Sequence, residues 1–286
     1  MALNKQIWLT QLAENFYPET SFLSKCVDLS GFVEYNQMHM GIAGIDPAVR
    51  INQKTYPIKD VERQDDEATF PLDTFETENT LIRNLEAIEV SYNKVESVVR
   101  QHRKTLQTAV GKKAIHAFAP NANTEDTPVL FTTGEAKNGR KRLSFDDILS
   151  LKEAFDGALI PQERRYIVLH PSHVTDLLRE DMQLFKDLTE IQNGEPHRFA
   201  GFGFYTFPFM PIYQDGEKTA FGADKVGNFA SVAFQADEVM KADGDLKMFS
   251  QIDDVHERAS IFGFEKRFVA MPIRNKGIGA IVSSNE

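Results

Sequence analysis

Two histidines that lie close together in the sequence are the first residues whose type and spacing could support chemistry. His170 and His173 bracket Pro171 and Ser172, and neutral imidazole is a common metal ligand. A zinc site needs three or four ligands in one place, and no second ligand cluster accompanies this pair. Because the pair stands where an apolar strand meets a helix pattern, we expect ordinary residues at a helix start and no bound metal.

Other groups that could act as acids, bases or nucleophiles are weaker candidates. Asp253, Asp254 and His256 could form a carboxylate–imidazole group, but the surrounding pattern predicts a solvent-facing turn that leads into a strand. Cys26 is the only cysteine, which excludes a disulfide within the chain and makes a reducing cytoplasm the natural compartment. Its flanks carry no signature of a catalytic thiol, so we expect a buried structural residue.

Motifs that identify common enzyme classes are absent from the sequence. There is no Gly-x-x-x-x-Gly-Lys-Ser/Thr loop, no Gly-x-Gly-x-x-Gly that opens a helix, and no Gly-x-Ser-x-Gly elbow. Gly201 and Gly203 lie in an aromatic segment that has the pattern of a strand. We therefore expect no catalytic residues, no cofactor and no enzymatic activity.

The charge of the chain argues against a protein whose main task is to grip nucleic acid. The formal net charge is −10 over 286 residues, whereas proteins that bind phosphate backbones are usually basic. Three basic clusters exist, but they lack the interleaved aromatic residues of a single-strand site. An acidic surface that aids solubility explains the charge most simply. An acidic shell wall that repels an enclosed nucleic acid is also compatible with it. The clusters are Lys112 and Lys113; Arg140, Lys141 and Arg142; and Arg164 and Arg165.

Length and composition predict a folded protein of one elongated domain or two closely connected ones. Hydrophobic residues make up 42% and charged residues 26% of the chain, which argues against wholesale disorder. Residues 1–15 lack a signal-peptide core, and no window approaches the roughly 18 apolar residues of a membrane helix. We expect a soluble protein that is made in a cytoplasm and contacts no membrane.

The first 60 residues contain segments that fit poorly into a core of their own. Residues 7–16 predict a short amphipathic helix that ends near Pro18. Residues 32–35 and 49–58 look extended, and the second of these segments has apolar residues on both faces. A strand without one apolar face suits a hairpin arm that lies along a neighbouring molecule. The helix face consists of Ile7, Trp8, Leu12 and Phe16, and the second strand carries Val49, Ile51, Tyr56 and Ile58.

An acidic run from Asp60 to Glu67 follows the second extended segment. A solvated loop is the simpler interpretation of such a run. The alternative is an acidic contact for a basic patch on another subunit.

The strongest secondary-structure pattern lies between about Asn79 and Ala119. Apolar residues recur there at three- and four-residue steps, Gly111 is the only glycine, and Pro120 follows the end. Some 40 residues at 1.5 Å each predict a rod of roughly 60 Å, much longer than the mean helix of about 11 residues. Because the stripe keeps no strict heptad and includes His102, we expect the helix to pack on a sheet, with a coiled coil as the alternative.

The remaining sequence predicts an α+β protein, because its helices and strands do not alternate regularly as in a doubly wound fold. Ser144 and Asp147 predict a capping box at the start of one helix, and Pro171 opens another. Strands are expected at residues 166–169, 202–207, 229–234, 246–249, 257–262 and 267–273.

This order of elements resembles the capsid fold of tailed bacteriophages, the Hong Kong 97-like fold. The most specific match is to that family's passage of proline, Arg-Tyr, apolar strand, proline, helix and Gly-Phe strand. The likeness spans nearly the whole chain, and its motifs encode the fold and no chemistry. The matching segments are residues 160–171 (Ile-Pro-Gln-Glu-Arg-Arg-Tyr-Ile-Val-Leu-His-Pro), Val174, Leu177, Leu178, residues 200–205 (Ala-Gly-Phe-Gly-Phe-Tyr), and the closing strands at 263–274 and 277–281.

The resemblance implies a division of the chain into four parts. An N-terminal arm would occupy residues 1–31 and an extended β-hairpin loop residues 32–75. Residues 76–120 and 246–286 would form a peripheral domain that contains a long spine helix, and residues 121–245 an axial α/β domain.

The resemblance also implies a function: a major capsid protein, assembled in the bacterial cytoplasm, whose hexamers and pentamers close an icosahedral shell around double-stranded DNA. The implied partners are further copies of the chain, a portal protein and a separate scaffolding or decoration protein. The DNA would be enclosed without sequence-specific binding. The predicted subunit contacts are Trp8, Phe16, Val49, Ile51, Lys54, Tyr56, Asp65, Asp66, Glu67, Arg140, Lys141 and Arg142.

Two alternatives remain open from the sequence. An encapsulin-type compartment would share the fold and enclose cargo enzymes in place of a genome. A soluble α+β enzyme would require a pocket with clustered titratable groups.

Overall fold

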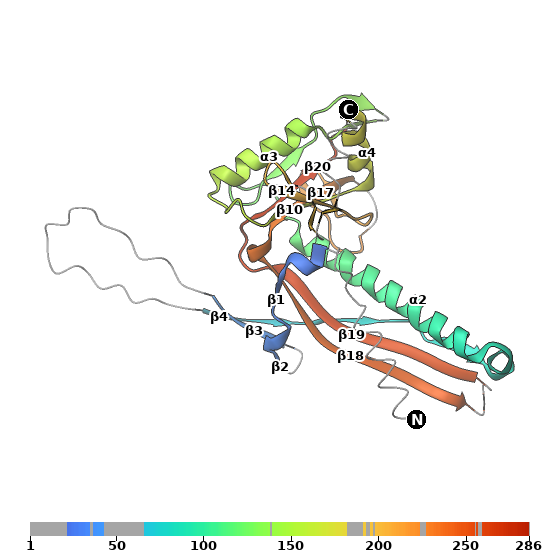
Figure 1. The fold of residues 1–286 in the computed structure, drawn as a ribbon. Helices are drawn as coiled ribbons and strands as arrows, with labels where there is room; N and C mark the ends of the chain where they lie inside the picture. The colour runs from blue at the N-terminus through green and yellow to red at the C-terminus, as the bar shows by residue number, and fades with distance from the viewer. Residues whose placement is uncertain are drawn as a thin grey trace, which may run out of the picture.

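The computed structural model describes residues 22–34, 37–42, 66–137, 139–181, 191–192, 195–196, 198–223, 227–254, 256 and 259–285. These residues form an elongated α+β molecule (Figure 1). We call the large sheet with two shorter helices the upper unit, and the long β-ribbon with one long helix the lower unit. A small hairpin projects away from the lower unit.

The lower unit is built on one long antiparallel ribbon of β18 (Val239–Asp254) and β19 (Ala259–Pro272). The helix α2 (Asn84–Phe118) lies along one face of this ribbon (Figure 1). Its 35 residues correspond to about 52 Å at 1.5 Å each, so the predicted long helix on a sheet is present. Short strands complete the sheet: β1 (Val27–Asp28) beside β18, and β5 (Asp73–Glu76) and β6 (Thr80–Arg83) beside β19.

The long helix begins five residues later than the sequence pattern predicts. The predicted start at Asn79 is wrong because residues 80–83 extend the sheet as β6, where Ile82 is buried against Val98 and Phe262. The end at Phe118, before Pro120, agrees with the prediction. The described part of the helix buries Val98, Val99, Leu106, Val110, Ala114, Ile115 and Phe118, and the predicted apolar positions before residue 98 lie outside the described side chains.

The end of the ribbon differs from the prediction as well. Two strands were expected at residues 257–262 and 267–273, but β19 is one continuous strand of 14 residues. From the sequence, Gly263 in the middle of this segment is consistent with a break between two strands. In the structure it makes room for a neighbour, because a Cβ there would lie 2.3 Å from Oδ1 of Asn79.

The upper unit contains an eight-stranded sheet and the helices α3 (Phe145–Gly157) and α4 (Pro171–Glu180). The predicted capping box is confirmed: the Asp147 N–H donates to Ser144 Oγ, and the Ser144 N–H donates to the Asp147 carboxylate. The strands are, in sheet order, β13 (Arg198–Phe199), β14 (Phe202–Thr206), β10 (Arg165–Leu169), β17 (Asn228–Gln235), β15 (Ile212–Gln214) and β16 (Glu217–Lys218), while β20 (Ile278–Val282) joins β17 to β7 (Val129–Phe131).

The last strand requires a change to the predicted division of the chain. Residues 246–286 were expected beside the long helix, but the structure divides this range: β19 lies beside α2, and β20 lies inside the upper sheet. The physical reason is burial, because all five residues of β20 are buried and such a strand requires neighbours on both sides. The remaining elements are short: η1 (Phe22–Lys25), η2 (Ser30–Phe32), η3 (Ala236–Glu238), β8 (Ala136–Lys137), β9 (Arg140–Lys141), β11 (Ile191–Gln192) and β12 (Glu195–Pro196).

The projecting hairpin is formed by β3 (Gln37–Ile42) and β4 (Asp66–Pro71), with β2 (Val33–Glu34) beside β3. An extended hairpin was predicted here, although Phe32 belongs to η2 and not to a strand. The predicted N-terminal helix, the second extended segment and the contact residues Trp8, Phe16, Val49, Ile51, Lys54, Tyr56 and Asp65 lie outside the described residues, as do the side chains of Asp66 and Glu67 in β4.

Candidate interaction surfaces

His170 and His173 have structural roles. His173 is fully buried in α4; its Nδ1 lies 2.7 Å from Ser231 Oγ and its Nε2 lies 2.9 Å from Ser283 Oγ. Burial lowers the pKa of His173 to about 3, and the nearby Arg140 guanidinium acts in the same direction. The ring is therefore neutral at pH 7, and it joins α4 to β17 and to the end of β20.

His170 caps the same helix. Its Nδ1 accepts a hydrogen bond from the Ser172 N–H at 3.1 Å, and its ring stacks on Phe229 with 3.9 Å between centroids. The expectation of an ordinary residue at a helix start agrees with this geometry. Across the residues that the structure describes, no three histidine, cysteine or carboxylate side chains gather as metal ligands would.

The other candidates for chemistry do not form a site either. The exposed Asp254 carboxylate accepts the His256 N–H at 2.7 Å where β18 ends, which is the solvent-facing turn that the sequence predicts. Cys26 is buried, and its thiol donates to the Phe22 carbonyl at 3.7 Å. Burial raises the pKa of this thiol to about 12, so the residue is an unreactive structural thiol.

The predicted contact residues Arg140, Lys141 and Arg142 lie in and after β9, against the end of the chain. Arg140 donates two hydrogen bonds, of 2.6 and 3.0 Å, to the buried Asp176 carboxylate. Lys141 uses its backbone N–H to bind the Ser284 carbonyl at 2.9 Å. Arg140 is thus part of the fold of its own subunit. The side chains of Lys141 and Arg142 are half-buried as well, and Arg142 Nη1 lies 4.0 Å from the Glu135 carboxylate.

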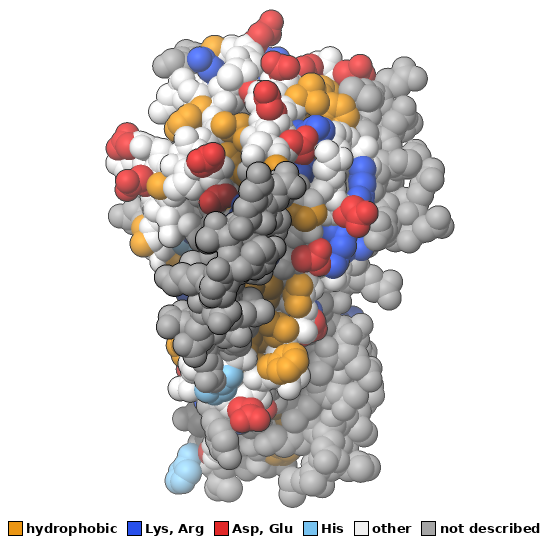
Figure 2. Space-filling view, turned by 90° about the vertical axis from the view of Figure 1, so that its left-hand side faces the viewer, with side chains coloured by type: hydrophobic (Ala, Val, Ile, Leu, Met, Phe, Trp, Pro, Cys, Tyr) orange, Lys and Arg blue, Asp and Glu red, His pale blue; other side chains and the backbone are white. Residues whose placement is uncertain are grey.

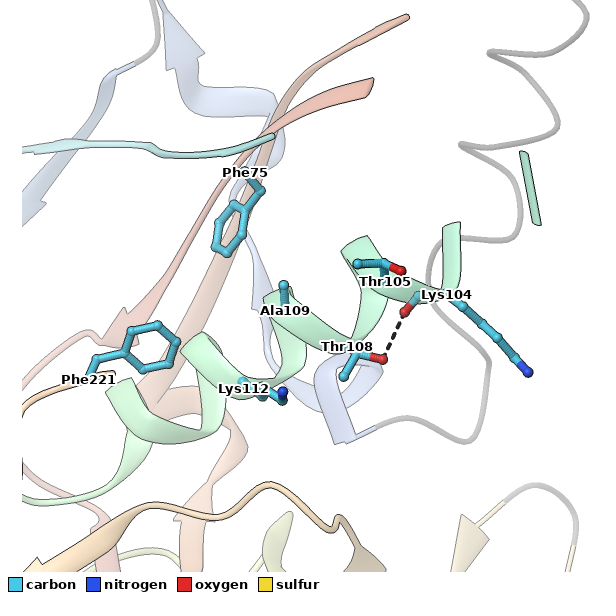
Figure 3. Close-up of a pocket in the computed structure, with 7 residues that line it drawn as sticks. All are labelled: Phe75, Lys104, Thr105, Thr108, Ala109, Lys112 and Phe221. Carbon is cyan, nitrogen blue, oxygen red and sulfur yellow. Dashed lines mark hydrogen bonds between the residues drawn. The ribbon is translucent and has the colours of Figure 1, made fainter. Parts of the chain in front are cut away.

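A groove of about 570 Å³ runs beside α2 between the two units (Figure 3). Phe75 from β5 and Phe221 from the loop after β16 form its apolar walls, and Lys104 and Lys112 supply cations from α2. The remaining lining residues are Thr105, Thr108 and Ala109.

Aromatic rings lie beside the cluster Lys112 and Lys113, which was expected to lack them. Lys112 Nζ lies 3.8 Å from the centroid of Phe209, and Lys113 Nζ lies 5.0 Å from that of Phe221. Sequence reasoning missed these pairs because the rings stand about 100 residues away from the lysines, and no local pattern connects them.

A second apolar surface lies at the far end of the ribbon. Phe249 of β18 is 55% exposed, Ile252 is 47% exposed and Leu81 of β6 is 40% exposed. Phe249 and Leu81 point away from α2, because their strand neighbours Met248 and Ile82 are the residues buried on the helix side. Large exposed side chains that gather in one place indicate a contact surface.

The face seen from the side of the projecting hairpin carries no broad basic patch among its described residues (Figure 2). Acidic and hydrophobic side chains are interspersed over the upper unit, and Lys and Arg gather along one side of it. No helix in the described part of the chain is both long and apolar enough to cross a membrane.

The fold matches solved capsid chains over almost their whole length. The capsid chain of Cyanophage P-SCSP1u matches with a TM-score of 0.66 and 15% identity, over 92% of this chain and 87% of that one. The capsid chain of an empty GTA particle matches with a TM-score of 0.64 and 13% identity, over 93% and 97%. A virus-like particle from Pyrococcus furiosus matches with a TM-score of 0.59 and 12% identity, over 96% of each chain.

These matches confirm the predicted α+β capsid fold. No family model and no curated protein matches the sequence itself. The similarity is therefore one of architecture, with little residue identity.

Proposed function

We propose that this chain is the major capsid protein of a tailed phage, which assembles as hexamers and pentamers into an icosahedral shell. One observation carries the proposal: nearly all of this chain superimposes on nearly all of several capsid chains. His170, His173 and Cys26 form no reactive centre, which favours a structural role.

In this proposal the parts of the chain take the places that the resemblance implies. The upper unit, together with β20, is the axial domain, and α2 with the β18–β19 ribbon is the peripheral domain. Residues 1–31 are the arm, and the extended loop begins at residue 32 and ends before β5, because that strand lies in the sheet of the lower unit. The change between the two domains lies in η3, at residues 236–238, where the chain passes from the upper sheet into the ribbon.

An elongated subunit with projecting segments suits a closed shell. Each contact between copies can be modest, because closure repeats it over many subunits. The contact residues predicted from the sequence remain part of the proposal, with the reservation that Arg140 already binds Asp176 within its own subunit.

The net charge of −10 supports enclosure of double-stranded DNA without strong binding, since an acidic wall repels the packed polymer. A portal protein and a separate scaffolding or decoration protein complete the proposed set of partners, and the particle is assembled in the bacterial cytoplasm.

An encapsulin-type compartment is the second candidate. The match that favours it is the one to the virus-like particle from Pyrococcus furiosus, which covers 96% of both chains and whose description names no phage. The two candidates differ in content, since one encloses a genome and the other encloses cargo proteins.

The experiment that tests the proposal is negative-stain electron microscopy with analytical sedimentation of the purified recombinant protein, alone and with its candidate scaffold. We expect closed polyhedral shells, tubes, or isolated pentamers and hexamers. A uniform monomer or dimer under all salt and crowding conditions, with and without the scaffold, would contradict the proposal. Particles that are purified from the cells that naturally produce the protein, and that hold cargo protein and no DNA, would select the second candidate.

A further inference from the structure

Within the described part of the chain, one edge of the ribbon is open along the distal half of β18. On one side β18 pairs with β19 along its length, whereas on the other side β1 pairs only with Met240 and Lys241. No other strand in the described ranges lies on that side of β18. A strand edge without a partner presents a row of backbone N–H and C=O groups that can pair with another strand.

The hydrogen bonds of β19 show which groups of β18 face this open edge. Both backbone groups of Phe264 point away from β18: its carbonyl accepts the Thr77 N–H at 2.9 Å, and its N–H donates to Thr77 Oγ1 at 3.0 Å. In an antiparallel ladder, opposite residues exchange two hydrogen bonds or none. Met248 lies opposite Phe264, so its N–H and C=O point toward the open edge.

The same argument applies to the residues two positions away on either side. Leu246 and Ser250 lie opposite Lys266 and Phe262, which places their backbone groups on the open edge as well. Their neighbours Lys247, Phe249 and Gln251 direct their backbone groups toward β19. The open edge therefore offers three regularly spaced donor and acceptor pairs, at residues 246, 248 and 250.

Nearer to β1, the same edge already binds extended chain. The Leu29 N–H donates to the Lys241 carbonyl at 2.9 Å, and the Asp243 N–H donates to Ser30 Oγ at 2.9 Å. The edge strand β1 thus lies beside the start of β18, and the chain leaves this edge where η2 begins. The remaining edge continues a surface that is already built to accept a strand.

The side chains along the open edge favour a protein partner. Phe249 and Ile252 are about half exposed and stand beside the free backbone groups, so a strand added here would also cover apolar surface. Lys247 is the only cation between Asp245 and Asp254, which makes a nucleic acid a poor occupant of this edge.

We propose that the edge of β18 from Leu246 to Ser250 binds an extended segment of a second copy of this chain by β-strand addition. The inference rests on the proposed shell-forming function and names one of its contacts. The described part of the chain contains a strand of the required kind, because β4 pairs only with β3. The projecting hairpin and the distal ribbon point in opposite directions in Figure 1, which favours contact between two molecules in a head-to-tail arrangement.

Amide hydrogen exchange with residue resolution tests the proposal directly. In unassembled subunits, the amides of Leu246, Met248 and Ser250 exchange fast while those of Lys247 and Phe249 are protected by β19. In assembled particles all five become slow. Fast exchange at the three edge amides in particles would overturn the inference while the shell function stands, and so would slow exchange already in the free subunit. If no assembly forms, the shell function and this contact fall together.

Proline substitution provides a second test with matched controls. Ser250→Pro removes an N–H that the ribbon itself does not use, so the monomer keeps its melting temperature while the yield of particles falls about tenfold or more. Ser250→Ala assembles like the parent, and Gln251→Pro, which removes an N–H bonded to β19, lowers the melting temperature. Unchanged assembly of Ser250→Pro would overturn the proposal.

A photo-crosslinking residue in place of the exposed Phe249 identifies the segment that lies on the edge. The expected product is a crosslink between two chains that forms in particles and not in free subunits. A crosslink confined to one chain would overturn the proposal.

Discussion

The Arg274 guanidinium donates two hydrogen bonds to the Glu238 carboxylate. One runs from Nε to Oε2 at 3.0 Å, and the other from Nη2 to Oε1. The chain crosses between the upper and lower units at η3 and again at residues 273–277, and this pair joins the two crossings. The Ile273 N–H binds the Glu238 carbonyl at 2.8 Å at the same place. These polar contacts join the two crossings, while one hydrophobic core runs through both units, because Phe234 of β17 belongs to the same buried cluster as Met248 and Phe264 of the ribbon.

The Arg274 pair should contribute modestly to stability and respond to salt. Arg274 is 66% exposed, so we expect Arg274→Ala to cost about 0.5–1 kcal/mol at low ionic strength and close to nothing in about 1 M salt. Arg274→Lys keeps the charge and loses the two-point geometry. Its free energy of unfolding should therefore lie between those of the parent and of Arg274→Ala. Urea unfolding at both salt concentrations measures this, and an equal loss in both would contradict the assignment.

Replacing Arg165 should reduce the free energy of unfolding far more than replacing Lys152, which binds the same Asp156. Its guanidinium is fully buried and donates to the Ile160 and Pro161 carbonyls and to Asp156. Because Arg165→Met removes a buried cation from Asp156 and leaves the carbonyl of the buried Ile160 without this donor, we expect a loss of about 3 kcal/mol. Lys152→Met removes an exposed ion pair to the same Asp156 and should cost less than about 1 kcal/mol. Similar losses in the two variants, measured by denaturant unfolding, would contradict this account.

His173 should make the fold sensitive to acid. Burial lowers the folded-state pKa of His173 to about 3, below the unfolded value of about 6.5. Between these two pKa values, the unfolded chain binds a proton on this ring and the folded chain does not. The contribution of His173 to stability is therefore fully present above about pH 6.5 and is lost as the pH falls toward 3. Between pH 6.5 and 5 we expect a loss of about 2 kcal/mol from this group. His173→Gln should lower stability at pH 7 and flatten the slope between pH 7 and 5, and an unchanged slope would contradict the assignment.

Charge reversal in the β9 segment should separate folding from assembly. Arg140→Glu places a carboxylate against the buried Asp176, so we expect a loss of about 2–4 kcal/mol of monomer stability. Lys141→Glu combined with Arg142→Glu should lower the melting temperature less than Arg140→Glu does, because Arg142 loses only a 4.0 Å pair with the exposed Glu135, and it should reduce particle yield. Sedimentation and calorimetry of both variants measure this. Full assembly of the double variant would place the loop outside any subunit contact.

Leu159 should tolerate replacement by glycine better than by alanine. It follows α3 with a φ of 56° and is 86% exposed, so its side chain contributes little while its backbone occupies the left-handed region. We expect Leu159→Gly to raise the free energy of unfolding by about 0.5–1 kcal/mol and Leu159→Ala to leave it nearly unchanged. A loss of stability in the glycine variant would show that the side chain has a packing role.

Features set by local chemistry were predictable from the sequence. Ser144 and Asp147 specify their capping box within four residues, and Pro120 limits the long helix whatever surrounds it. The strand at residues 165–169 follows from a run of apolar residues with no polar face. In each case the residues that decide the structure are neighbours in the sequence.

Features set by tertiary contacts could not be predicted. Residues 80–83 carry a helical pattern, but they form a strand because β19 offers them an edge. The pair of Arg140 and Asp176 joins residues 36 positions apart, and the open edge of β18 depends on where β1 stops. These three features depend on residues that are far apart in the sequence, so no periodic pattern of neighbouring residues predicts them.

The position of β20 has a consequence for the timing of synthesis. This strand enters the sheet between β17 and β7, and it pairs Ala280 with Val129, a partner translated about 150 residues earlier. Contacts between such distant residues form late, so the upper sheet stays incomplete until residue 282 has left the ribosome. In the proposed shell, a nascent chain cannot present a finished upper unit to its neighbours, so subunits still in synthesis would stay outside it.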